Sequence, residues 1–68
     1  DQRVEQVLEK IRYTRVSKGI SILELSVRAD ISRSQVYYLE SKRKIPSLSL
    51  LFRIADALEV DINTFFAE

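Results

Sequence analysis

The side chains best suited to binding chemistry lie between residues 32 and 44, where hydroxyl and basic groups surround two tyrosines. Arg33 carries a guanidinium fork that matches the O6 and N7 atoms of guanine, and Ser34 can exchange hydrogen bonds with several bases. Lys42, Arg43 and Lys44 form a basic run that suits the phosphate oxygens of a duplex. This segment therefore predicts recognition of DNA.

The charge of the chain is unevenly distributed, although its net value is only +1. Residues 10–44 hold nine basic and three acidic side chains, a net charge of +6, whereas residues 1–9 sum to −2 and residues 45–68 to −3. A phosphate-facing surface needs such a concentration, because each bound Lys or Arg releases a condensed counterion. A solvated surface on which charges cluster without function is the alternative.

Several kinds of chemistry are disfavoured by composition. The 68 residues include no Cys and no His, which argues against disulfides, thiolate chemistry, the usual zinc sites and imidazole catalysis. There is no Gly-rich phosphate loop or carboxylate cluster, so we expect no enzyme, metal site or cofactor. No apolar run approaches the about 18 residues of a membrane span, and no signal-peptide pattern is present.

The elements that position these groups are expected to be helices, since the chain has one Gly and one Pro. Apolar spacing predicts a single all-α domain of residues 1–68, with helices at about residues 2–18, 22–29, 33–41, 48–58 and 62–67. Gly19 should end the first helix, and Ser21 with Glu24 forms the pattern of a capping box. Ser32 and Ser47 are expected N-caps, and Leu48 is expected inside with the rest of the fourth helix's apolar face.

Residues 22–41 have the pattern of two short helices joined by a tight turn, the form of a helix-turn-helix. Ser26 is the small residue where the helices would touch, and Asp30 is a turn residue that tolerates positive φ. The expected inward set is apolar: Leu25, Ala29, Ile31, Val36 and Leu39. Together these features predict that the second of the two helices is held outward.

Here the chain resembles the phage repressor and Cro-type helix-turn-helix family, also called the xenobiotic-response-element family. The resemblance runs from about Val7 to Phe66. Its marks are Ile11-Arg12 through Arg15, Gly19-Ile20-Ser21, Glu24-Leu25, Ile31-Ser32-Arg33-Ser34, Leu39-Glu40, Lys44-Ile45-Pro46-Ser47 and Ala57-Leu58-Glu59-Val60-Asp61. It implies a five-helix, lambda-repressor-like DNA-binding domain with helix 33–41 in the major groove.

On this resemblance the DNA contacts divide into two sets. Base contacts are expected from Arg33, Ser34 and Tyr38, with phosphate contact the alternative for Arg33. Backbone contacts are expected from Ser21, Ile22, Ser32, Tyr37, Ser41, Lys42, Arg43 and Lys44. Partial burial against the loop after the recognition helix is the alternative for both tyrosines.

The resemblance also implies a structural salt bridge between Arg15 and Glu40, which would fix the recognition helix. The sequence departs from the family where glutamine is usual at Ile22, alanine at Ser26, and glycine at Asp30 and Lys42. Of these, Ile22 removes a side chain that commonly grips a phosphate.

The expected function is sequence-specific binding of duplex DNA by a transcriptional regulator, with repression as its mode. Many relatives bind inverted repeats as dimers, so we expect a homodimer on DNA, with Phe65 and Phe66 as candidate contacts and one of the two closing the core. The expected location is the cytoplasm of a prokaryote, for a host or phage protein held on the nucleoid through DNA. The alternative is a protein-interaction module that keeps the fold and uses Ile22, Leu23 and Val27 on the second helix.

Overall fold

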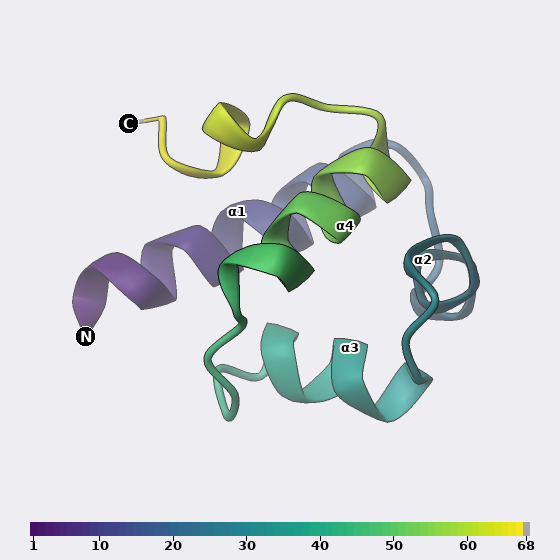
Figure 1. Cartoon of the computed structure of the whole chain (residues 1–68), viewed down its shortest axis with the longest axis horizontal. Helices are drawn as coiled ribbons and strands as arrows, with labels where there is room; N and C mark the ends of the chain where they lie inside the picture. The colour runs from purple at the N-terminus through teal and green to yellow at the C-terminus, as the bar shows by residue number, and fades with distance from the viewer. Residues whose placement is uncertain (68) are drawn as a thin grey trace.

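A computed structural model describes residues 1–67 of the chain. It contains four α-helices, α1 (Gln2–Ser17), α2 (Ile22–Ala29), α3 (Arg33–Glu40) and α4 (Leu48–Leu58), and then the 3-10 helix η1 (Ile62–Phe65). No strand occurs in the described part. The all-α prediction is confirmed, and α3 and η1 lie on opposite sides of the layer formed by α1 and α4 (Figure 1).

The fifth α-helix predicted at residues 62–67 is wrong, because the chain forms a 3-10 helix of four residues there. The carboxylate of Asp61 accepts from the backbone N–H of Asn63, and the Phe66 N–H donates to the Asn63 carbonyl. Asn and Thr side chains favour such local turns over an α-helical continuation. Phe65 can nevertheless reach the core from this single turn.

Serine caps begin three of the helices. The Oγ atoms of Ser21, Ser32 and Ser47 each accept a hydrogen bond from the backbone N–H three residues later. The reciprocal capping box predicted at Ser21 is only half formed, because the Glu24 carboxylate pairs with Arg28 on the next turn. A complete box is found instead at Ser32.

Each α-helix is followed, one or two residues after its last residue, by a residue of positive φ: Gly19 (69°), Asp30 (57°), Lys42 (65°) and Glu59 (58°). The next residue in each case returns its backbone N–H to a carbonyl five positions earlier, as in the Schellman motif. Only the first of the four is a glycine, for which this region carries no Cβ penalty. The other three hold a strained conformation that the surrounding helices impose.

Glu59→Gly is therefore expected to stabilise the fold by about 0.5–1 kcal/mol, raising the melting temperature by a few degrees. The side chain of Glu59 is exposed and forms no ion pair or hydrogen bond within residues 1–67. Thermal unfolding followed by circular dichroism measures the change, with Glu59→Ala as a control that removes the charge but keeps a Cβ. An equal gain from alanine would show that φ strain is not the cause.

The core is built around α4. Ile54 and Leu58 are fully buried, and α1, α2, α3 and η1 each contribute at least one residue that is 3 % exposed or less. The buried apolar set is Leu8, Ile11, Ile20, Leu25, Ala29, Val36, Leu39, Leu50, Leu51, Ile54, Ala55, Ala57, Leu58 and Phe65. Leu48, predicted inside, is 63 % exposed, because the first turn of α4 buries Leu50 and Leu51 instead.

Among the described residues, no helix combines the length and apolar character required to cross a lipid bilayer.

Candidate nucleic-acid interface

The connection between α2 and α3 is the tight turn that the sequence pattern predicts. Ser26 is buried where the helices meet, and its hydroxyl donates to the Leu23 carbonyl at 2.6 Å. Asp30 enters the left-handed region, and the N–H of Ile31 donates to the Ser26 carbonyl at 3.0 Å. A small, internally satisfied residue and a left-handed turn thus allow α3 to leave α2 abruptly.

An exposed polar surface remains on α3 once its apolar side is packed. Val36 and Leu39 are buried, whereas the remaining side chains of the predicted set, Arg33, Ser34, Tyr37, Tyr38 and Ser41, are all exposed. The structure therefore leaves the three predicted base-contacting residues of α3 exposed to solvent.

The two tyrosines are both open to solvent, at 54 % exposed for Tyr37 and 45 % for Tyr38. Their rings meet edge to face with centroids 6.0 Å apart. About half of each tyrosine is therefore covered, and the other half is open to solvent. Both phenol groups are free to donate to an acceptor outside the protein.

The first turn of α3 is fixed by a feature that the sequence analysis did not assign. The side-chain oxygen of Gln35 accepts from the Ser32 N–H at 2.9 Å, while the Ser32 hydroxyl accepts from the Gln35 N–H at 3.0 Å. The Ser-x-x-Gln spacing is itself a capping-box signal. Because Ser32 only accepts in this box, its hydroxyl proton is available to a phosphate.

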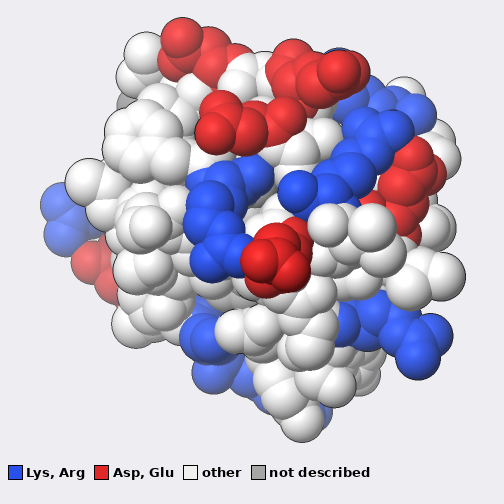
Figure 2. Space-filling model, turned by 45° about the vertical axis from the view of Figure 1, so that its right-hand side comes forward, with Lys and Arg blue, Asp and Glu red and all other residues white. Residues whose placement is uncertain are grey.

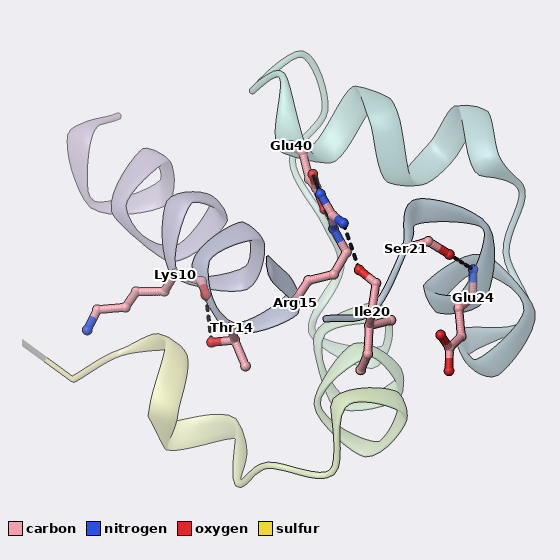
Figure 3. A network of polar contacts seen from close by, with 7 residues as sticks. All are labelled: Lys10, Thr14, Arg15, Ile20, Ser21, Glu24 and Glu40. Atoms are coloured by element: carbon pink, nitrogen blue, oxygen red, sulfur yellow. Dashed lines mark hydrogen bonds and ion pairs between the residues drawn. The ribbon is translucent and has the colours of Figure 1, made fainter. Parts of the chain in front are cut away.

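The other end of α3 is held by the ion pair of Arg15 and Glu40 (Figure 3). The guanidinium Nε and Nη2 donate to the two carboxylate oxygens at 2.6 and 2.9 Å, and Nη1 donates to the Ile20 carbonyl at 2.8 Å. Both side chains are nearly buried, at 11 % and 8 % exposed. One arginine thus ties together α1, the turn after it and α3.

Two further arginines tie α2 to α4, and the sequence analysis missed this role. Arg53 of α4 donates through Nη2 to the carbonyls of Ala29 and Asp30 at 2.6 Å each. Arg28 of α2 donates in return to the Ala57 carbonyl at 3.2 Å. Each guanidinium satisfies the last carbonyls of the opposite helix, so the turn before α3 is braced from behind.

The basic loop, defined as Lys42, Arg43 and Lys44, follows α3 and is exposed along its length. Lys42 lies 3.4 Å from the Glu9 carboxylate, which partly offsets its charge. Arg33, Arg43 and Lys44 take part in no ion pair within residues 1–67. In Figure 2 the lower part, at the height of α3 in Figure 1, carries Lys and Arg but no Asp or Glu.

The start of α2 differs from the expected phosphate grip in one respect. Ile22 is half-buried and packs against the core, and an isoleucine side chain has no group that binds a phosphate, so the expected contact at this position would come from its backbone N–H. Of the three apolar residues of the alternative interaction surface, Ile22 is half-buried, whereas Leu23 (53 % exposed) and Val27 (71 %) are exposed. The backbone N–H groups at this helix start and the exposed Ser21 hydroxyl, which only accepts in its cap, can meet a phosphate.

The two phenylalanines near the end of the described chain have separate positions. Phe65 is 1 % exposed and closes the core beside α1, as expected for one of the two, which leaves it no surface for a dimer contact. Phe66 is 53 % exposed and stays a candidate. The difference arises because the 3-10 turn directs consecutive residues to different sides.

Comparisons with known proteins agree with this geometry. A family model described as helix-turn-helix matches residues 11–65. This range contains Arg15, Arg28 and Arg53 and the whole of α2 and α3. No curated protein sequence matches the chain significantly.

Three solved structures are similar to the chain. The restriction-modification controller protein C.AhdI from Aeromonas hydrophila is 24 % identical, with a TM-score of 0.91 over 97 % of this chain and 100 % of its own. An HTH_3 family transcriptional regulator from Vibrio cholerae is 23 % identical, with a TM-score of 0.90 over 96 % of this chain and 36 % of its own. The hypothetical transcription factor NHTF from Neisseria is 33 % identical, with a TM-score of 0.87 over 97 % of this chain and 77 % of its own.

Proposed function

Because the chain belongs to the helix-turn-helix family of DNA-binding transcription regulators, we propose that it reads a specific duplex sequence through α3 and acts as a repressor. The observation that carries the proposal is the outer side of α3. Its polar side chains are exposed, while Arg15 holds one end of the helix and Arg53 braces the turn before the other. Such preorganisation lowers the entropic cost of docking into a groove.

Base recognition is assigned to exposed side chains of α3, the helix whose N-terminal residues face the base edges of the major groove in this motif. Arg33 is suited to a bidentate contact with guanine O6 and N7. Ser34 and Tyr38 lie one helical turn apart on the same face, so both can reach neighbouring base pairs. The three together span enough of the groove to define part of a half-site.

Contacts to the DNA backbone are assigned to the groups on either side of α3. The basic loop would follow one strand, and the backbone N–H groups of Ser21, Ile22 and their neighbours at the α2 start would meet a phosphate on the other side. The hydroxyls of Ser32, Tyr37 and Ser41 lie between them. These groups set register and affinity, whereas the three base-reading residues set the sequence.

One α3 reads about half of an operator. We therefore propose a homodimer on DNA that binds an inverted repeat, with half-site centres about one helical turn apart. A dimer seated over a promoter represses by excluding the polymerase. A cytoplasmic location accompanies this function.

Salt-dependent binding to a labelled duplex tests the proposal. Fluorescence anisotropy at several salt concentrations gives the binding constant, and its logarithm should fall linearly with the logarithm of the salt concentration. The slope should correspond to several phosphate contacts, at about −0.9 per contact. Lys44→Ala should reduce the slope by about one contact and weaken binding to all sequences alike. Arg3→Ala is the matched control, because Arg3 lies beside Phe65 and Phe66 on the η1 side, away from α3.

Absence of duplex binding at low salt would contradict the proposal. The exposed Leu23 and Val27 on α2 would then favour the second candidate function, a protein-interaction module, with these two residues as its contact surface.

A further inference from the structure

The three cations of the basic loop are not equivalent, because one of them is paired with an acid of the protein itself. The Nζ atom of Lys42 lies 3.4 Å from a carboxylate oxygen of Glu9, whereas Arg43 and Lys44 take part in no ion pair within residues 1–67. Glu9 belongs to α1, whose first half lies on the same side of the molecule as the end of α3 and the basic loop (Figure 1). A carboxylate is therefore present at the edge of the surface assigned to phosphate.

The backbone at Lys42 is fixed, so only its side chain can change partners. Lys42 has a φ of 65°, and its N–H donates to the Leu39 carbonyl at 3.0 Å. The N–H of Arg43 donates to the Tyr38 carbonyl at 2.9 Å, which completes the end of α3. The ammonium group can move between Glu9 and a phosphate by rotation of its flexible four-carbon chain alone.

The pair is open to solvent and to a duplex. The side chains of Lys42 and Glu9 are 40 % and 56 % exposed, in contrast to the nearly buried pair of Arg15 and Glu40. An exposed ion pair of this kind contributes little to the stability of a fold. Its consequence for binding is electrostatic, because a phosphate that approaches Lys42 meets a carboxylate of the same sign of charge on the same ammonium group.

We propose that Glu9 competes with DNA phosphate for Lys42 and thereby limits the affinity of the domain for every duplex. The inference rests on the proposed function and identifies a residue that opposes binding beside a surface that favours it. While Glu9 holds Lys42, the charge of the lysine is offset inside the protein, so it releases less than one counterion from DNA. Because phosphate contacts carry no base information, the limit applies equally to all sequences.

The same helix contains a matched control. Glu5 lies one turn before Glu9 on α1, is exposed, and takes part in no ion pair within residues 1–67. Glu5→Gln and Glu9→Gln change the net charge of the chain by the same amount. A difference in DNA binding between the two variants therefore measures the pair with Lys42 and not the total charge.

Salt-dependent fluorescence anisotropy with a labelled duplex tests the inference. Glu9→Gln should raise affinity for all sequences by about two- to fivefold and steepen the salt slope by up to about 0.9, the value of one phosphate contact. Glu5→Gln should leave the slope unchanged. The gain from Glu9→Gln should disappear in a Lys42→Met background and persist in a Lys44→Ala background.

The outcomes separate this inference from the proposed function. Failure of the wild type to bind any duplex overturns both. Binding by the wild type with no gain in Glu9→Gln, or with an equal gain in Glu5→Gln, overturns the inference alone. A loss of affinity in Glu9→Gln also overturns it, because Glu9 would then orient Lys42 toward phosphate. So does a gain that persists in the Lys42→Met background, which would mean direct repulsion between Glu9 and DNA. Circular dichroism melts verify that each variant is folded.

Discussion

Glu40→Ala is expected to lower the free energy of unfolding by about 3–5 kcal/mol, because it leaves the Arg15 guanidinium buried without its counter-ion. The two side chains are only 11 % and 8 % exposed, so water cannot replace the lost carboxylate. A domain of this size rarely has more than about 3–5 kcal/mol of stability from its core. The variant should therefore be largely unfolded at 25 °C, as measured by urea denaturation.

Two further variants distinguish the loss of the Arg15–Glu40 ion pair from a general effect of substitution on stability. Replacing both partners, as Arg15→Met with Glu40→Leu, should be less destabilising than Glu40→Ala, because no uncompensated charge remains. Arg3→Ala breaks an ion pair whose side chains are 89 % and 46 % exposed, and it should change stability by less than about 1 kcal/mol. A loss below about 1 kcal/mol in Glu40→Ala would contradict the structural role given to the pair.

Arg33→Ala is expected to weaken binding to the preferred operator by about 1–3 kcal/mol, or roughly 5- to 150-fold, and to relax the choice of base at one position. The weakening is expected because alanine cannot make the bidentate contact of the Arg33 guanidinium with guanine O6 and N7. Arg33→Lys keeps the charge but not the fork, so it should also lose selectivity. Selection and sequencing from a pool of random duplexes, run on the wild type and both variants, measures the change.

Lys44→Ala is the matched control for Arg33, since both are exposed basic residues without an ion pair within residues 1–67. Lys44→Ala should weaken binding to all sequences equally and leave the selected motif unchanged. If Arg33→Ala instead behaves like Lys44→Ala, and lowers the salt slope by about 0.9, then Arg33 contacts a phosphate and the base assignment is wrong.

The parts of the fold that depend on local sequence could be predicted. The caps at Ser32 and Ser47, the positive φ of Asp30 and the small buried Ser26 all follow from preferences that act within a few residues. The outer set of α3 follows from the helical period once Val36 and Leu39 are placed inward. For the same reason, the exposure of Arg33, Ser34, Tyr37 and Tyr38 follows from the sequence alone, whereas their contacts with DNA stay a prediction.

The sequence was less informative where packing between distant segments decides which side chains are buried and which groups they contact. Leu48 fits the apolar period of α4, yet the core closes on Leu50 and Leu51, and no local rule distinguishes them. One of Phe65 and Phe66 was expected in the core, but they are adjacent and alike in type, so only packing against α1 decides which one it is. Arg53 reaches carbonyls more than 20 residues earlier in the chain, a contact that has no signature in sequence spacing.

The central claim is that the outer side of α3 reads a duplex sequence. The most direct test is selection of wild-type protein against random duplexes, with sequencing of the bound fraction. The account predicts an enriched motif of two inverted halves, about one helical turn apart, with a guanine whose enrichment disappears in Arg33→Ala. Salt-dependent binding without any enriched motif would contradict it, and would leave only a non-specific attraction between the basic loop and phosphate.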